Sequence, residues 1–221
     1  MSTERVTVNP GHWGVVFCAA LLVGCANMAS FQTAEVLERG DREVGAGASF
    51  SSYNDQVLGG DDEIMMVPAL NGWFRQGMGD GFEARGMAWL PLGWRAGIKY
   101  QIAGESGADG THLAVGGDVG HMRVTTGTGD DQESLQLVDA YFPLYTGHRF
   151  GPRSAAYLTP QYVLRVAIGE DDIDIHQTVA ATLGLGLGDR DRFYVEMTGG
   201  FETSSQSMLV HGGFGFSTGR W

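Results

Sequence analysis

Three side chains in the second half of the chain are of the types that hydrolytic chemistry uses. Asp174 and His176 lie two residues apart in an alternating segment, so on a β-strand they share a face and the carboxylate could orient the imidazole. Ser134, at the end of another alternating segment, is the candidate nucleophile. A histidine among acids more often joins ordinary hydrogen bonds, and no other histidine lies at metal-ligand spacing from this one. We keep the three residues as catalytic candidates, but assign no enzyme activity and no metal site.

Two other patterns have the composition of ligand loops without their context. The stretch 184–188, Gly-Leu-Gly-Leu-Gly, lies in an alternating segment and its turn, whereas a phosphate-binding loop precedes a helix. The stretch 171–174, Asp-Asp-Ile-Asp, lacks the glycine and the distal glutamate of a calcium-binding loop. We therefore expect no cofactor.

The N-terminus has the layout of a secretory signal peptide. A polar start that contains Arg5 is followed by an apolar run, 13–24, that ends in a small residue. The run is shorter than the roughly 20 residues that a membrane-spanning helix needs, which argues against an N-terminal anchor helix. Cleavage after the run removes Cys18 with the leader.

A cysteine follows directly after this run. The residues 22–25, Leu-Val-Gly-Cys, resemble the lipobox of bacterial lipoproteins. The resemblance implies cleavage before Cys25, a diacylglycerol on its sulfur and acylation of its new amino group. Ala26, the next residue, resembles the outer-membrane address of Gram-negative lipoproteins. An ordinary signal peptide followed by a chance cysteine is the alternative.

We expect three regions: a lipoprotein signal peptide at 1–24, a lipidated N-terminal tether at 25–40 and one folded domain at 41–221. Cys25 is the only cysteine left after cleavage, so the mature chain has no disulfide. The formal net charge of −12 argues against a nucleic-acid partner. A hydrophobic content of 43% is too high for a disordered chain.

Apolar and polar residues alternate throughout the folded region. Segment 93–103 shows this clearly, with Trp94 and Ile98 on one face and Arg95 and Lys99 on the other. A helix would scatter these charges around its surface, so the alternation predicts a strand. Similar segments lie at 42–53, 63–76, 81–90, 93–103, 111–125, 133–145, 154–168, 173–187, 192–202 and 207–217.

These segments predict an all-β fold, a closed antiparallel up-and-down transmembrane β-barrel of about ten strands. Closure removes the exposed edges that so long a sheet would otherwise present. The 35 glycines let strands curve and make room beside bulky lumen residues. The alternative is eight strands, if 81–90 and 93–103 are a single bent pair that we have over-split.

Residues 40–221 resemble the small outer-membrane β-barrel proteins of Gram-negative bacteria. The resemblance rests on alternation, glycine content, short turns and a terminal aromatic residue, Trp221. It implies assembly by the barrel-assembly machinery and contact with outer-membrane lipids and lipopolysaccharide. No functional residue is carried over by it.

Charge distinguishes the two ends of the expected barrel. Three connections that share one end are acidic; they contain Asp55, Asp61, Asp62, Asp130, Asp131, Glu170, Asp171 and Asp172. The opposite end carries Arg149, Arg153, Arg190, Arg192 and Arg220. A tethered N-terminus places the arginine end in the periplasm and the acidic loops outside, where divalent cations could bridge them to lipopolysaccharide phosphates. Simple solvated loops are the alternative.

Alternation also predicts which charged side chains face the lumen. We expect a lumen charge network of Glu43, Glu83, Arg85, Arg95, Lys99, Asp118, Arg165, Glu196 and His211. Mixed charge in a narrow barrel favours a filled lumen, and with it a structural or surface-interaction role. The alternatives are a narrow pore for small solutes, an outer-rim hydrolase or acyltransferase acting on envelope lipid, and a periplasmic lipid-binding barrel on a lipid tether. The last of these needs an apolar lumen.

Overall fold

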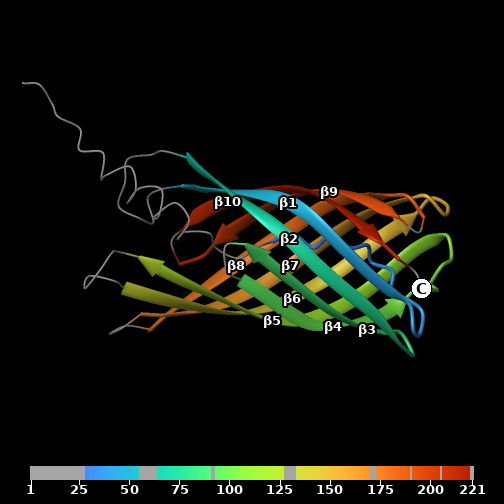
Figure 1. Ribbon diagram of the computed structural model, residues 1–221, viewed down its shortest axis with the longest axis horizontal. Helices are drawn as coiled ribbons and strands as arrows, with labels where there is room; N and C mark the ends of the chain where they lie inside the picture. Colours follow the sequence, from blue (N-terminus) through green and yellow to red (C-terminus); the bar gives the residue numbers. More distant parts are fainter. Residues whose placement is uncertain are drawn as a thin grey trace, which may run out of the picture.

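The computed structural model describes residues 28–54, 64–90, 93–126, 133–169, 173–189, 191–204 and 206–219. Within these ranges the chain forms strands that wind obliquely around a common axis (Figure 1). They are β1 (Arg42–Asn54), β2 (Ile64–Gly79), β3 (Phe82–Leu90), β4 (Gly93–Ala103), β5 (Gly110–Thr126), β6 (Glu133–Arg149), β7 (Ser154–Ile168), β8 (Ile173–Leu187), β9 (Arg192–Glu202) and β10 (Ser207–Thr218). The expected strand segments are confirmed. No helix in the described ranges is long and apolar enough to cross a membrane.

Backbone hydrogen bonds link each strand to its neighbours in sequence, and the antiparallel pairing of β1 with β10 closes the ring. β3 and β4 are separate strands that pair from Phe82–Tyr100 to Trp89–Gly93. The closed up-and-down barrel with ten strands is therefore confirmed, and the eight-strand alternative is wrong. No strand is left with a free edge along its whole length, which is what closure achieves for a sheet of this size.

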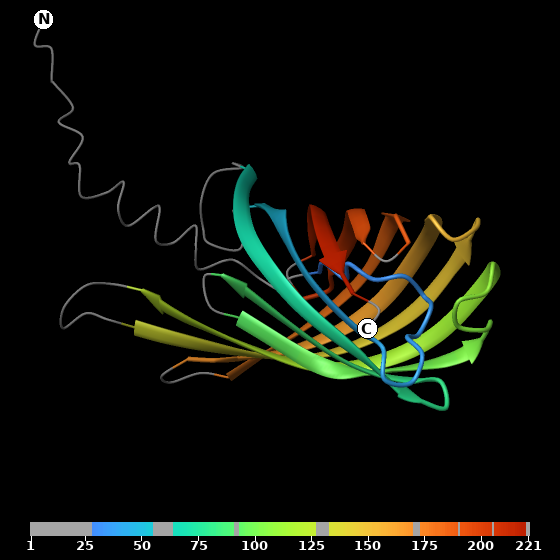
Figure 2. The same cartoon turned by 45° about the vertical axis from the view of Figure 1, so that its right-hand side comes forward.

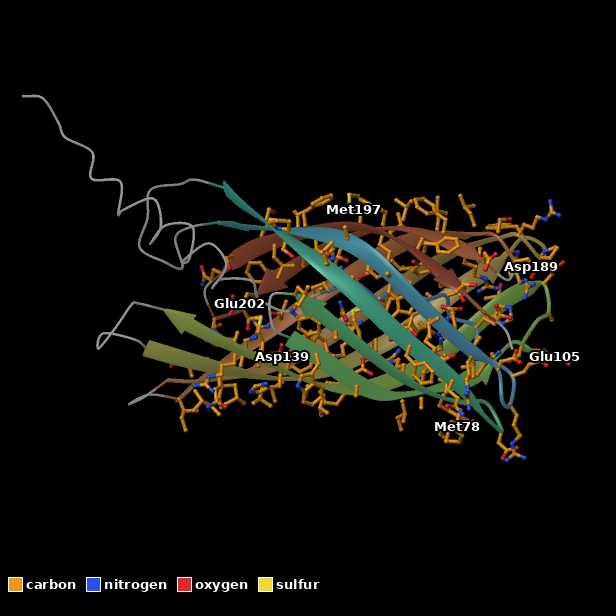
Figure 3. The ribbon with its side chains drawn as sticks, in the orientation of Figure 1. Met78, Glu105, Asp139, Asp189, Met197 and Glu202 are labelled. Atoms are coloured by element: carbon orange, nitrogen blue, oxygen red, sulfur yellow. The ribbon has the colours of Figure 1, made fainter. Side chains whose placement is uncertain are left out.

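The alternation places apolar side chains outside and polar ones inside. In β4, Trp94 is exposed while Lys99 is buried. Figure 3 shows Met78 and Met197 on the outer surface, and Asp139 belongs to the buried, inward set. This is the reverse of what a periplasmic lipid-binding barrel needs, because such a barrel has a polar exterior and an apolar lumen.

Large inward aromatic side chains are accommodated by glycines on neighbouring strands. A Cβ atom at Gly45 would lie 2.2 Å from the indole of Trp73, and one at Gly93 would lie 2.2 Å from the indole of Trp89. Only a residue without a side chain fits under these rings. Both tryptophans are therefore buried in the barrel.

The two ends of the barrel are named here from β1. The proximal end, where β1 begins and β10 ends, carries the connections 80–81, 104–109, 150–153 and 188–191. The distal end carries the connections 55–63, 91–92, 127–132, 169–172 and 203–206. The acidic residues expected at one end fall in 55–63, 127–132 and 170–172, which lie outside the described residues.

The residues before β1 lie inside the barrel. Every residue from Met28 to Leu37, here called the plug segment, is buried. Residues 38–41 then reverse the chain at the proximal end, where the Gly40 N–H donates to the Gly77 carbonyl at 3.0 Å. Figure 2 shows this part of the chain, in blue, within the curve of the strands.

This arrangement corrects two expectations. Residues 25–40 were expected to form a tether, but the described part of that range fills the lumen because its side chains and backbone find partners there. The chain also reaches β1 from inside the barrel, running from mid-lumen to the proximal end. A tethered N-terminus therefore does not fix the proximal end as periplasmic.

Candidate functional site: the occupied lumen

The plug segment belongs to no strand, so its buried backbone groups need other partners. Wall side chains accept hydrogen bonds from three of its N–H groups. The Ser30 N–H donates to Glu196 Oε2 at 2.8 Å, and the Leu37 N–H donates to Glu83 Oε2 at 3.0 Å. The Val36 N–H donates to the Gln101 side-chain oxygen at 3.1 Å. Carboxylates and an amide of the wall thus replace the missing sheet partners.

Cations of the wall bind carbonyl groups of the same segment. Lys99 Nζ donates to the carbonyls of Thr33 at 2.9 Å and Glu35 at 2.8 Å. The Arg75 guanidinium also reaches the Glu35 carbonyl, at 3.0 Å. Arg95 donates to the Ala29 carbonyl at 2.6 Å. Charged side chains of the wall therefore bind the backbone of the plug segment directly.

Glu35 is the charged anchor of the segment at the proximal end. Its carboxylate accepts from Arg149 at 3.0 Å, from Arg192 at 3.3 Å and from the Gly107 N–H at 2.7 Å. Sequence reasoning placed both arginines at this end but missed that their guanidinium groups are buried. Arg190 and Arg220, which were assigned to the same end, lie outside the described residues.

The wall charges also pair with one another. Arg75 lies between Glu43 and Glu83, with nitrogen–oxygen distances of 3.2 and 2.8 Å, and Lys99 is 3.6 Å from Glu83. Because every one of these groups has an opposite charge beside it, the cost of burying them is reduced.

A second group of wall charges lies farther around the ring. Arg85 forms a bidentate contact with Asp118 at 2.7 and 2.8 Å, and Arg165 forms one with Asp139 at 2.7 and 2.9 Å. Planar two-point pairs of this kind are the strongest ion pairs available to proteins. The first pair joins β3 to β5 across β4, and the second joins the neighbouring strands β6 and β7.

The residues expected in the lumen network all belong to the barrel's inner side. Those that are buried are Glu43, Glu83, Arg85, Arg95, Lys99, Asp118, Glu196 and His211, and Arg165 is partly buried. His211 differs from the others because its contact is with a hydroxyl, Ser51, at 2.9 Å. Sequence reasoning missed Arg75, because the stretch 64–67 at the start of β2 is apolar at every position and does not indicate which face is inward.

An aromatic stack holds the middle of the plug segment. The ring of Phe31 lies 4.8 Å from that of Trp73 at an interplanar angle of 22°. Phe31 has a φ of 42°, a left-handed conformation that is rare for a bulky residue and costs free energy. A Cβ at Gly213 would come within 2.9 Å of the Phe31 ring, so the wall has a glycine where the ring needs space.

Two small cavities lie beside the segment. One cavity, lined by Ser30, Gln32 and Arg85 among others, measures about 10 Å³, and a second, lined by Thr33, Glu35 and Arg149 among others, is of the same size. Each has room for about one water molecule. Along the described residues the lumen is packed rather than open.

In the described part of the chain His176 has partners other than the candidate Asp174. His176 Nδ1 lies 2.7 Å from Glu202 Oε1 and 3.1 Å from Ser204 Oγ, at the distal rim (Figure 3 labels Glu202). A hydrolytic triad needs the acid and the nucleophile on different ring nitrogens, whereas here both groups meet the same one. Asp174 is exposed, and the Ser134 side chain lies outside the described residues. Among the described residues no group of three or more His, Cys, Asp or Glu is arranged to hold a metal ion.

Comparison with known proteins finds likeness only to solved structures, at low sequence identity. No protein-family model matches the chain, and no curated protein matches it significantly. Among solved structures it is similar to the translocator domain of the autotransporter NalP from Neisseria meningitidis, with 12% identity over 94% of this chain and 95% of that one and a TM-score of 0.46.

Two further solved structures show the same likeness. An outer-membrane channel from Pseudomonas putida has 8% identity over 87% of this chain and 100% of that one, with a TM-score of 0.48. The attachment invasion locus protein Ail of Yersinia pestis has 9% identity over 83% of this chain and 99% of that one, with a TM-score of 0.33. All three are bacterial outer-membrane β-barrels, but at these identities no binding property or activity carries over to this chain.

Proposed function

We propose that this protein is a bacterial outer-membrane β-barrel closed by its own N-terminal segment, with a structural or surface-interaction role. The observation that carries the proposal is the burial of every residue from Met28 to Leu37. Charged side chains of the wall form hydrogen bonds and ion pairs with this segment along its length. A barrel whose lumen is filled in this way contributes its outer surface and its loops, because the plug segment occupies the path that solutes would take.

The outer surface supports a membrane location. Large apolar side chains of all ten strands are exposed, including Leu70 at 62%, Met197 at 62% and Ile98 at 58%. A soluble monomer rarely exposes a continuous apolar area beyond a few hundred Å². Lipid chains would cover such a belt, and every strand of the closed barrel has a hydrogen-bonded neighbour on each side.

The connections support an orientation. The longest connection, 55–63, is at the distal end, and so is 127–132, which joins the two strands of 17 residues. In outer-membrane barrels the longer loops face outward. We therefore place the acidic distal loops at the cell surface, beside lipopolysaccharide, with divalent cations as the bridging ions.

Lipidation of Cys25 is part of the proposal and rests on the leader sequence. Cys25 precedes Met28, the first residue of the plug segment, by three residues. Met28 contacts Gln161 in mid-lumen, and the chain runs from there toward the proximal end. Mass spectrometry of the membrane-extracted protein, with Cys25→Ser as the control, tests for the acyl groups.

Conductance tests the closed lumen. Mature protein reconstituted in planar bilayers should show no steady current, whereas a variant lacking residues 28–37 should open in discrete steps. A heat-dependent mobility shift on a semi-native gel shows whether the variant is a folded barrel. Steady conductance of the intact protein, equal to that of the shortened one, would refute the filled-lumen proposal and favour the narrow pore.

A further inference from the structure

Three donors of the barrel converge on one carboxylate at the proximal end. Glu35 Oε1 accepts from Arg149 Nη1 at 3.0 Å and from the Gly107 N–H at 2.7 Å. Glu35 Oε2 accepts from Arg192 Nη2 at 3.3 Å. Arg149 ends β6, Arg192 begins β9, and Gly107 belongs to the connection 104–109. The wall and a turn thus supply the donors, whereas the acceptor belongs to the plug segment.

Other guanidinium groups of the wall have carboxylates of the wall as partners, at 2.7–2.8 Å. These pairs are Arg75–Glu83, Arg85–Asp118 and Arg165–Asp139. They remain complete when the plug segment leaves.

The arginines that bind Glu35 differ in this respect. Arg149 has Asp109 at 3.7 Å, but 66% of that side chain is exposed. In the described part of the chain, Glu35 is the carboxylate that pairs with Arg192. Departure of the plug segment therefore leaves two guanidinium groups without the carboxylate that they share.

These donors suit a carboxylate in particular. Guanidinium groups and a backbone N–H form charge-assisted hydrogen bonds with its two oxygens. Both arginines are buried, so little water competes with the bound oxygens. A cavity of about 10 Å³, lined by Glu35 and Arg149 among others, lies beside the carboxylate. A free carboxylate at this place would meet the same three donors as Glu35 does.

We propose that Arg149, Arg192 and the Gly107 N–H form a binding site for the carboxylate of a small solute, which Glu35 occupies in the closed barrel. A free carboxylate binds this site only in the open state, because Glu35 blocks it in the closed one. A ligand that binds one of two states shifts the equilibrium toward that state. Small carboxylic acids therefore favour release of the plug segment. The proposal rests on the closed lumen of the proposed function, and the experiment below separates the two.

Acetate is the matched probe for this site. Glu35→Ala removes one methylene group and the carboxylate, which together have the size of acetate. Acetamide has the same shape without the charge and is the control solute. The open fraction of the native chain and of Glu35→Ala is measured by single-channel recording in planar bilayers, with potassium acetate replacing potassium chloride at constant ionic strength.

Acetate should change the two open fractions in opposite directions. In the native chain it competes with Glu35, so the open fraction should rise about tenfold at roughly nine times the dissociation constant of acetate for the open barrel. In Glu35→Ala it fills the vacated site of the closed barrel, so the open fraction should fall roughly tenfold, which corresponds to one charge-assisted hydrogen bond. Acetamide should change neither. A general effect of the salt would move both chains in the same direction.

Two variants show whether acetate acts at this place. Glu35→Gln removes the charge but keeps the space filled, so acetate should not lower its open fraction. Arg192→Ala combined with Glu35→Ala removes one donor, and the effect of acetate should then be lost. An equal fall in Glu35→Ala with and without Arg192 would refute the site.

The outcomes separate the carboxylate site from the closed lumen. If the native chain is closed but acetate and acetamide act alike on both chains, the site is refuted and the filled lumen stands. If the native chain conducts steadily, as the variant lacking residues 28–37 does, the closed lumen fails and the site fails with it. Should Glu35→Ala not show the mobility shift of a folded barrel, the native chain carries the test: no rise of its open fraction with acetate refutes the proposal.

Discussion

Replacing Glu35 by alanine should open the lumen. The change leaves Arg149 and Arg192 buried without their shared carboxylate, which now accepts from them at 3.0 and 3.3 Å. Breaking a buried ion pair by removing one partner costs about 3–5 kcal/mol. Arg149 keeps a hydrogen bond to the Gly151 carbonyl at 3.2 Å, and Asp109 remains 3.7 Å away, so the lower figure, about 3 kcal/mol, applies here.

That loss acts on the closed state alone, because water solvates both arginines once the plug segment has left. About 1.4 kcal/mol corresponds to a tenfold change, so the open fraction should rise roughly 100-fold. Single-channel recording in planar bilayers measures the open fraction directly. Glu38→Ala is the control, since Glu38 is three residues away and exposed.

Equal open fractions for Glu35→Ala and Glu38→Ala would refute the assignment of Glu35 as the anchor. A double variant, Glu35→Ala with Arg149→Ala, removes one of the two arginines that are left without a carboxylate partner. It should recover part of the lost stability of the closed state. Strict additivity of the two changes would mean that the groups do not interact in the folded barrel.

Three further predictions follow from single contacts. Phe31→Ala removes the stack on Trp73 and should destabilise the closed barrel by about 3–5 kcal/mol. The measurement is the temperature at which the gel mobility shifts, which should be lower than in the native protein. An unchanged temperature would count against the observed packing. Lys99→Met deprives the Thr33 carbonyl of its donor and should cost about 1–3 kcal/mol by the same measurement, whereas Glu83 keeps its contacts with Arg75. His176→Ala, at the partly exposed distal rim, should change stability by no more than about 0.5 kcal/mol and should alter no ester-hydrolysis rate; a loss of hydrolysis would revive the enzyme alternative.

Alternation made the strands predictable, because period two is a local property of the chain. β4 illustrates this: the faces assigned to Trp94 and Lys99 from the sequence are those of the structure. The plug segment could not be found in the same way, because residues 28–37 show no period and their partners belong to distant strands. Glu35 was the available signal, an acid in a short segment whose arginine partners lie more than a hundred residues away.

Contacts between side chains of different strands could not be predicted from the sequence either. The burial of Trp89 depends on Gly93 lying opposite it, and that of Trp73 on Gly45, which only the strand register reveals. His176 was paired with Asp174 because both share a face, but the structure gives it Glu202 from the next strand. The face on which a side chain lies follows from the sequence of its own strand. Its contacts depend also on how that strand pairs with its neighbours.

The position of the plug segment sets an order on folding. The ring closes where β1 meets β10, the pairing most distant in sequence and therefore among the slowest to form. The segment joins β1 through the short reversal at 38–41, so it cannot enter sideways once that seam is made. Its exit lengthwise from a finished ring breaks every contact that wall charges make with its backbone. We therefore expect the sheet to wrap around the segment before the pairing of β1 with β10 closes the ring.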